Sequence, residues 1–176
     1  MAADTLSIRR ATPADAELIA AFNQAMAAET EGRRLDGATL AAGVRAVLRE
    51  PARGVYYLAE RSEGLSARGG AVVGQLLLTY EWSDWRNGWF WWIQSVYVAP
   101  AARGGGVYRK LHEHVAALAR AAGDVCGVRL YVDAGNAAAQ AVYRRLGMTV
   151  TNYRLFETDW SGAAHNSHAA PDGTAR

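Results

Sequence analysis

Apolar residues recur along this chain with two spacings, one typical of β-strands and one typical of amphipathic helices. The strand-like patterns span residues 6–9, 54–60, 71–81, 89–98, 128–132 and 149–157. The helical patterns span residues 12–29, 36–50, 107–118 and 136–147. This order predicts an α/β fold with a mixed, mainly antiparallel sheet of six to seven strands, flanked by about four helices.

Short polar signals mark where these elements begin and end. Thr12 is placed to cap the first helix, with a proline in the first turn and Asp15 reaching back to the cap. Asp36 can cap the second helix, and Pro51 prevents that helix from continuing. The pair Asn87-Gly88 supplies the positive φ angles of a tight return. The two longest strands therefore form a hairpin.

This hairpin holds five of the chain's six tryptophans. Strict alternation would place Trp92, Gln94 and Val96 on the face opposite to Trp91 and Ile93. The aromatic residues therefore cannot all fill one core. Either they pack in a core and a dimer interface, or some of them line a pocket in which aromatic rings and carboxylates hold a cationic amine.

Length and composition exclude several classes of protein. At 176 residues the chain can bury a core without disulfides or metal. We expect one domain over residues 1–160 and a disordered tail over residues 161–176. The lone Cys126 permits no internal disulfide, and no apolar run is long enough to span a bilayer. We expect a cytoplasmic protein without a membrane partner.

Charge and histidine placement argue against two further classes. The net charge is +2 and the arginines are scattered, so we expect no nucleic-acid partner. His112 and His114 are two positions apart on a predicted helix, so their side chains point to different sides. We therefore expect no metal site.

A glycine-rich loop follows the second hairpin strand directly. That strand stops at Pro100, Arg103-Gly-Gly-Gly106 comes next, and helical periodicity begins at Val107. The first turn of a helix has free N–H groups and the positive end of the helix dipole, so it attracts phosphate oxygens. Glycines allow close approach, and Arg103 adds charge. The loop lacks the Gly-Lys-Ser/Thr of a Walker motif, and a turn that binds nothing is the alternative.

Two motifs in order resemble those of the GNAT superfamily of N-acetyltransferases. Residues 103–108, Arg-Gly-Gly-Gly-Val-Tyr, are similar to its R/Q-x-x-G-x-G/A loop for acetyl-CoA. Residues 136–148 resemble its N-x-x-A-x-x-x-Y-x-x-x-G-F/M segment. The resemblance implies a GNAT-like fold, acetyl-CoA as the acetyl donor and transfer to an amine. Tyr108 departs from the family, which usually has Gly or Ala there.

The resemblance also implies roles for individual residues. The pyrophosphate of acetyl-CoA would lie on Arg103, Gly104, Gly105, Gly106, Val107 and Tyr108. Val96 and Val98 would hold the pantetheine arm, and Asn136 would contact the cofactor while it caps its helix. Tyr143 would protonate the leaving thiolate, because a phenol has a pKa similar to that of a thiol. The alternative for Tyr143 is a half-buried ring that only packs.

The resemblance does not assign the general base or the acceptor site to residues of this chain. The positions at which the family often has a glutamate hold Trp92 and Tyr131 here. Glu81 is the first substitute as catalytic base, followed by Asp133 and Asp84. We predict that the acceptor, a small cationic molecule with a primary amine, contacts Glu29, Trp82, Asp84, Trp92 and Gln94.

The leading hypothesis is an acetyl-CoA-dependent N-acetyltransferase that acts by direct attack in a ternary complex. One alternative keeps the fold without the chemistry, as an inactive acyl-CoA-binding regulatory module. Another is an interaction protein with an aromatic surface. The tryptophans of the hairpin also suggest a homodimer.

Overall fold

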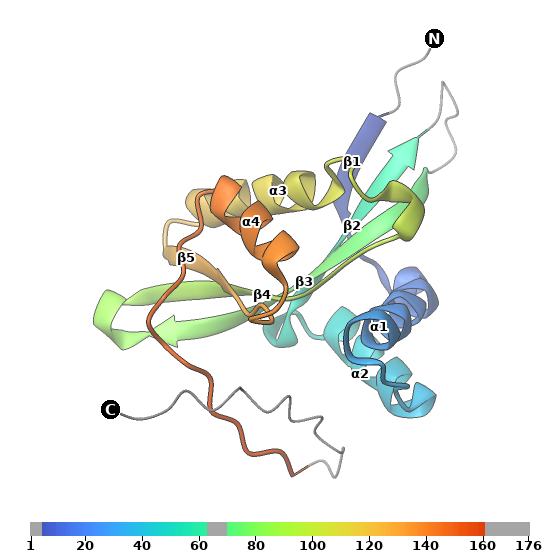
Figure 1. Ribbon diagram of the computed structural model, residues 1–176, viewed down its shortest axis with the longest axis horizontal. Helices are drawn as coiled ribbons and strands as arrows, with labels where there is room; N and C mark the ends of the chain where they lie inside the picture. Colours follow the sequence, from blue (N-terminus) through green and yellow to red (C-terminus); the bar gives the residue numbers. More distant parts are fainter. Residues whose placement is uncertain (1–4, 63–69, 161–176) are drawn as a thin grey trace.

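A five-stranded sheet runs through the computed structural model, which describes residues 5–62 and 70–160 (Figure 1). The strands are β1 (Thr5–Arg10), β2 (Val55–Ser62), β3 (Ala71–Ser83), β4 (Gly88–Val98) and β5 (Val125–Leu130). They lie side by side in chain order. The first three pairings are antiparallel, whereas β5 is parallel to β4. The predicted mixed, mainly antiparallel sheet is thus confirmed, but its strand number is not.

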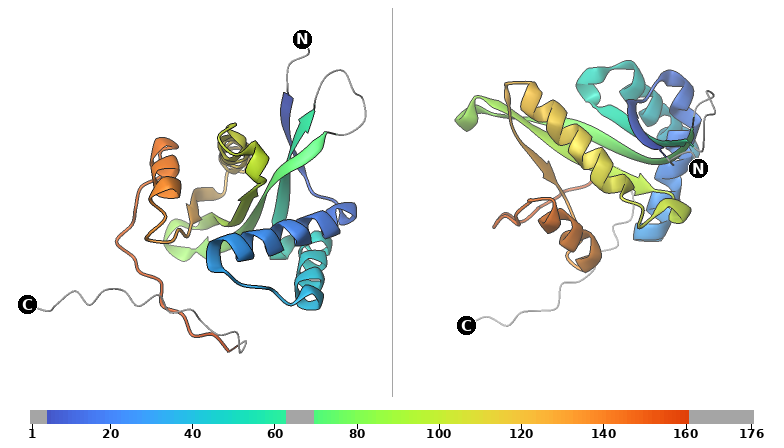
Figure 2. Two further views of the ribbon diagram at one scale, coloured as in Figure 1. Left: turned by 45° about the vertical axis from the view of Figure 1, so that its right-hand side comes forward. Right: turned by 90° about the horizontal axis from the view of Figure 1, so that it is seen from above.

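The helices divide between the two faces of this sheet (Figure 2). They are α1 (Ala16–Glu31), α2 (Gly37–Arg49), α3 (Val107–Ala121) and α4 (Ala137–Arg145). The crossover from β4 to β5 lays α3 on one face, and α4 lies beside α3. The other face is covered by α1 and α2 over part of its length. The hairpin of β3 and β4 extends beyond them (Figure 1).

Each covered face has its own apolar core. Under α3, Leu111 and Val115 pack against a cluster that includes Leu76, Leu78 and Ile93 of the sheet. Under α1 and α2, the fully buried residues include Ile19, Val44 and Leu58. Burial of a large aliphatic side chain stabilises a fold by about 1.5–3 kcal/mol. These two clusters hold the helices against the sheet.

The predicted start signals are confirmed by hydrogen bonds. Asp15 accepts from the backbone N–H of Thr12, as the capping box requires, and also from the hydroxyl of Thr12. Asp36 accepts from the backbone N–H of Thr39 at 2.8 Å. The hairpin turns through Asn87, whose φ of 46° is positive as expected. Gly88 is needed for a different reason, because a Cβ there would lie 2.8 Å from the carbonyl oxygen of Asp124.

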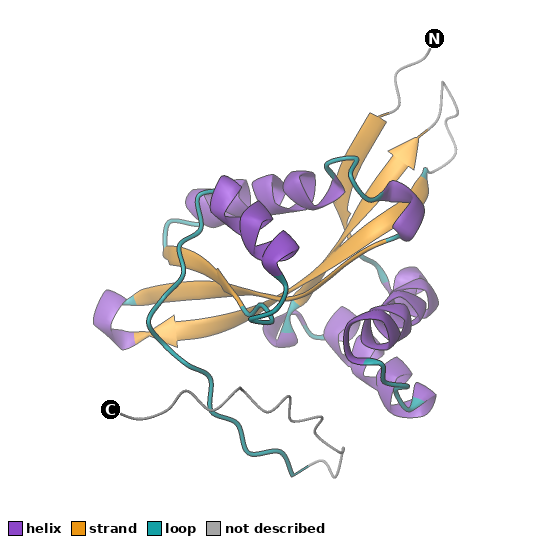
Figure 3. Cartoon of the chain, in the orientation of Figure 1, coloured by secondary structure: helices purple, strands orange, loops and turns teal. Residues whose placement is uncertain are grey.

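The prediction of a sixth strand over residues 149–157 is wrong. Residues 149–160 form no strand in the structure, and all of them are exposed (Figure 3). A strand needs a hydrogen-bonded neighbour, and the outer edge of β5 has none among the described residues. Apolar spacing can indicate an extended backbone, but it does not say which edge the backbone pairs with. The expected tail at 161–176 lies outside the described residues.

Candidate functional site

A fork opens in the middle of the sheet, where β4 and β5 stop pairing. Their last paired residues are Ile93 and Leu130. Directly beyond this pair, Gln94 is an extra residue in the ladder with β3, since Leu78 pairs with Ile93 and Leu77 with Ser95. Such a bulge bends its strand. Within the described part of the chain, the rest of β4 therefore has a strand neighbour on one side only.

The bulge overturns the strict alternation predicted for this strand. Val96 packs against the core under α3 together with Trp91 and Ile93, instead of facing the same way as Trp92. Val98 packs on that side as well. Both valines predicted to hold the pantetheine arm thus lie on the α3 side of the fork, past the last residue that pairs with β5.

The glycine loop lies at the mouth of this fork. Gly104 and Gly106 have φ angles of 76° and 77°, which residues with a Cβ rarely adopt. Helix α3 begins at Val107, immediately after the loop. A groove of about 790 Å³ runs along the loop. The predicted residues that line the groove are Val98, Arg103, Gly104, Gly105, Gly106, Val107 and Tyr108.

Sequence reasoning missed further residues of this groove. Arg109 lines it from the first turn of α3, and Val142, Arg145 and Leu146 form its α4 wall. Arg61 of β2 also reaches the loop, because a Cβ on Gly105 would lie 2.9 Å from its Nη2 atom. Together with Arg103, these arginines surround the loop with positive charge, which suits an anionic ligand. Arg109 could have been predicted from the sequence, because it lies three residues after Gly106, in the first turn of the helix that begins at Val107.

Arg103 is held from three directions at the edge of the loop. Its Nε atom donates to the carbonyl oxygen of Val98 at 3.0 Å, and its Nη2 atom donates to the carboxylate of Glu29 on α1. Tyr97 lies under its guanidinium, 5.7 Å from the ring centroid, and donates its hydroxyl to Glu29 at 2.9 Å. Arg103 and Tyr97 lower the pKa of Glu29. Glu29, predicted for the acceptor site, thus lies beside the phosphate loop.

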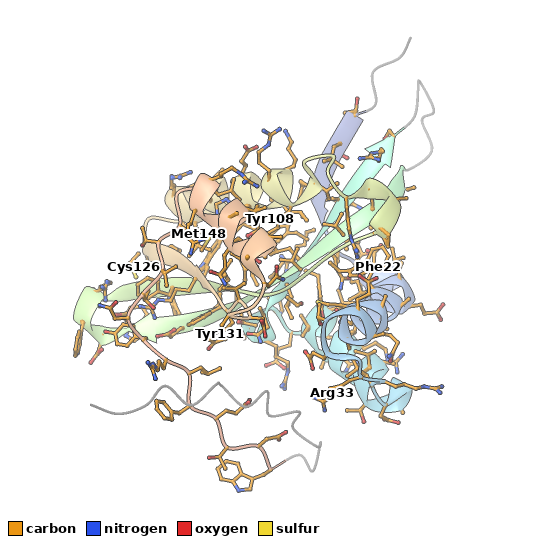
Figure 4. All side chains as sticks on the ribbon, viewed as in Figure 1. Phe22, Arg33, Tyr108, Cys126, Tyr131 and Met148 are labelled. Carbon is orange, nitrogen blue, oxygen red and sulfur yellow. The ribbon has the colours of Figure 1, made fainter. Side chains whose placement is uncertain are left out.

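The side chain of Tyr108 turns away from the loop and lies between α3 and α4 (Figure 4). Its ring meets that of Tyr143, with centroids 5.5 Å apart, and approaches His112. Its hydroxyl is buried without a hydrogen-bond partner among the described residues. Burial raises the pKa of both phenols above the usual value. Tyr143 is therefore protonated at neutral pH, as a general acid must be.

The other residue expected from the downstream motif, Asn136, caps α4. Its side-chain oxygen accepts from the backbone N–H of Ala139 at 3.0 Å. The capping role is confirmed. Contact with a cofactor remains a prediction, since Asn136 does not belong to the lining of the groove.

The opposite face of the fork carries Glu81 in a dense set of contacts. Arg129 donates through Nη1 to both carboxylate oxygens, at 2.9 and 3.1 Å, and Trp92 donates through its indole N–H. Tyr131 stacks on Trp92 with centroids 4.4 Å apart, just after the last residue of β5 (Figure 4). The guanidinium carbon of Arg129 lies 3.4 Å from the ring centroid of Phe90. No local pattern indicates the pair Glu81–Arg129, whose members are 48 positions apart.

The remaining acceptor candidates do not gather at one place. Gln94, at the bulge, accepts from the hydroxyl of Thr79 at 3.4 Å. Trp82 packs edge-on against Trp89 farther along the hairpin, and Asp84 accepts from the next backbone N–H in the turn. Trp82 and Asp84 thus lie toward the hairpin tip, whereas Trp92 and Gln94 lie at the fork. Within residues 5–62 and 70–160, no three His, Cys, Asp or Glu side chains group to hold a metal ion, and no helix is long and apolar enough to cross a membrane.

Comparisons with known proteins agree with this geometry. The profile of the acetyltransferase (GNAT) family matches residues 28–148. A "possible acetyltransferase" from Clostridium difficile 630 is 38% identical, with a TM-score of 0.77 over 88% of this chain and 97% of the other. An aminoglycoside N-acetyltransferase solved with CoA has a TM-score of 0.70 at 14% identity, over 90% and 97% of the two chains. A comparison with curated proteins gives no match.

A Trypanosoma brucei acetyltransferase also shares the fold, with a TM-score of 0.63 at 21% identity over 88% of this chain and 99% of the other. The chain belongs to the GNAT acetyltransferase family. It has the α/β fold of that family, and the family supports an acyltransferase activity.

Proposed function

We propose that this protein is an acetyl-CoA-dependent N-acetyltransferase that acetylates the primary amine of a small cationic molecule by direct attack in a ternary complex. The observation that carries the proposal is the groove along Gly104–Gly106, which joins the start of α3 to the open edge of β4. The positive φ angles of its glycines and the charge of its arginines suit a pyrophosphate. From the loop, the groove extends along the end of β4 toward the fork.

Each part of the site has a role in this reaction. The loop N–H groups and the nearby arginines hold the pyrophosphate, and the unpaired edge of β4 at Val96 and Val98 holds the pantetheine arm. The amine approaches from the opposite face, and Glu81 takes its proton directly or through water. As the C–N bond forms and the C–S bond breaks, Tyr143 donates a proton to the sulfur.

A second function is favoured by one specific observation. Both positions that often hold a family glutamate are aromatic here, Trp92 and Tyr131, and these two rings stack on each other. Glu81 is already paired with Arg129. A protein that binds acyl-CoA without turnover would show the same groove. Binding and turnover must therefore be measured separately.

The test begins with calorimetric titration of acetyl-CoA into the wild-type protein and into the Arg103→Ala/Gly106→Glu variant. We expect binding by the wild type and its loss in the variant, because the new side chain carries negative charge into a backbone position that disfavours any Cβ. CoA release is then measured over a library of amines. Absence of wild-type binding at millimolar acetyl-CoA would reject the proposal. Binding without release of CoA for any amine would favour the regulatory module.

A further inference from the structure

The contacts of Arg129 leave part of its guanidinium available to a ligand. Only Nη1 bonds to Glu81, and neither Nε nor Nη2 has an acceptor within residues 5–62 and 70–160. The side chain is still 32% exposed. The ring of Phe90 packs against the guanidinium, with its centroid 3.4 Å from the guanidinium carbon, which restricts the movement of this group. A planar group with free donors and restricted movement is well suited to bind a carboxylate.

The free donors of Arg129 lie close to the fork between β4 and β5. Arg129 pairs with Trp92 one step before the final pair of β4 and β5. Its neighbours Val128 and Leu130 pack toward α3, so its own side chain points to the other face. The groove of the glycine loop lies on the α3 and α4 side. A donor in the groove and an acceptor near Arg129 would therefore meet at the fork from opposite faces.

Charge at this position argues against an acceptor that is only cationic. The carboxylate of Glu81 is neutralised by Arg129 and also accepts from Trp92. A second cation would compete with an ion pair that already exists. A ligand with both an ammonium and a carboxylate instead balances the charges of both residues, because its carboxylate takes the free donors of Arg129 while its ammonium lies near Glu81.

We propose that the acceptor carries a carboxylate close to its primary amine, as an amino acid does, and that Arg129 is the residue that selects it. This inference rests on the acetyl transfer to an amine in the proposed function, and it replaces the cationic acceptor by one that carries both an ammonium and a carboxylate. The ring of Tyr131, 52% exposed and stacked on Trp92, offers an apolar surface beside the charged pair for the rest of the acceptor. Arg129 is thus a specificity residue at the acceptor site.

The test compares each of a set of L-amino acids with its own carboxamide, with full-length protein and saturating acetyl-CoA. We expect kcat/KM to be about 10- to 100-fold higher for the amino acid than for the amide, the range expected from hydrogen bonds to a charged group. The amine of an amide is less basic and thus more often uncharged. A preference for the acid therefore cannot come from amine reactivity.

Variants of Arg129 separate recognition from folding. Arg129→Gln should remove the preference through KM, with little change in the affinity for acetyl-CoA. Arg129→Lys should restore part of it. Glu81→Gln/Arg129→Gln avoids leaving an unpaired Glu81 carboxylate, and it is compared by binding alone because Glu81 is the proposed base. Arg53→Gln, an exposed arginine paired with Glu50, is the matched control. Equal rates for acid and amide, or a preference that survives Arg129→Gln, would overturn the inference.

A binding measurement keeps this inference distinct from the proposed function. The same amino acids and amides are titrated by calorimetry into the protein saturated with CoA. If no amine is acetylated but an amino acid binds and Arg129→Gln abolishes that binding, the inference holds and the proposed chemistry fails. If neither amino acids nor amides bind at millimolar concentration and turnover with other amines is unaffected by Arg129→Gln, the inference fails alone.

Discussion

The ring of Tyr108 meets the ring of Tyr143 edge-on, with centroids 5.5 Å apart and planes inclined by 70°. Tyr108 stands in the first turn of α3, directly after the phosphate loop, whereas Tyr143 belongs to α4. The contact therefore links the helix that starts at the loop to the helix that carries the candidate acid. The tyrosine that departs from the family pattern fills space between two helices and leaves the loop open.

Tyr108→Phe should not destabilise the protein. The hydroxyl of Tyr108 is buried without a partner among the described residues, and an unsatisfied polar group of this kind costs about 1–3 kcal/mol. We expect the free energy of unfolding to stay equal or to rise by about 1 kcal/mol, whereas Tyr108→Ala should lower it by about 3 kcal/mol. Urea unfolding measures both changes. A clear loss of stability in Tyr108→Phe would reveal a partner of the hydroxyl, such as a buried water.

Tyr143→Phe should lower kcat by about 10²-fold and leave the affinity for acetyl-CoA unchanged, since it removes a proton donor and keeps the ring. Burial raises the pKa of Tyr143 above its ordinary value near 10. The phenol thus stays protonated through neutral pH, and its loss of activity on deprotonation should appear only above about pH 10. Measurement of kcat against pH checks both points. A wild-type kcat in the variant would leave Tyr143 with a packing role alone.

Glu29→Gln should strengthen the binding of CoA by about two- to fivefold. The guanidinium of Arg103 is now shared between the carboxylate of Glu29 and the carbonyl oxygen of Val98, so a pyrophosphate must compete for it. Calorimetry measures the change, with Glu31→Gln on the same helix as the control. A weaker affinity in Glu29→Gln would instead mean that Glu29 holds Arg103 in its binding position.

Asp15→Asn should lower the free energy of unfolding at neutral pH by about 1–2 kcal/mol. Arg9 lowers the pKa of Asp15, and so does Thr12. A carboxyl whose pKa is lowered by folding stabilises the protein above its unfolded pKa near 4, and this contribution disappears as the pH falls toward the folded pKa. The difference between wild type and variant should therefore shrink in acid. Unfolding curves at several pH values test this, and a constant difference would contradict it.

Leu155→Asp/Phe156→Asp should convert a dimer into a monomer, because we propose that the segment 149–160 is covered by a second copy. Phe156 and Trp160 are 92% and 89% exposed, and the outer edge of β5 has no strand partner among the described residues. Exposed apolar side chains and an open strand edge each favour association. Light scattering gives the mass, with Thr151→Asp as the control. A monomeric wild type at all concentrations would rule the dimer out.

The parts of this fold that the sequence predicts correctly rest on local chemistry. The caps at Thr12 and Asp36, the turn at Asn87 and the loop at Gly104–Gly106 each follow from residues within a few positions of one another. Their hydrogen bonds and backbone angles do not depend on the rest of the chain. The same holds for the order of strands and helices that the apolar spacing indicates.

The parts that the sequence does not predict depend on distant partners. Arg103 lies 74 positions from Glu29, and nothing near either residue indicates the other. The pair of Glu81 and Arg129 forms only because β5 lies beside β4. The missing strand at 149–157 is the opposite case, in which a suitable local pattern has no edge to pair with among the described residues. The bulge at Gln94 likewise comes from the register between two strands.

That bulge also separates two kinds of mutation that evolution can sample in β4. A substitution at Gln94 changes one side chain and leaves the strand in phase. Deletion of Gln94 would remove the extra residue, so that Ser95, Val96, Tyr97 and Val98 would keep their pairing with β3 and their faces, but the bend that separates β4 from β5 would be lost. In this strand the number of residues is therefore under stricter control than their identity.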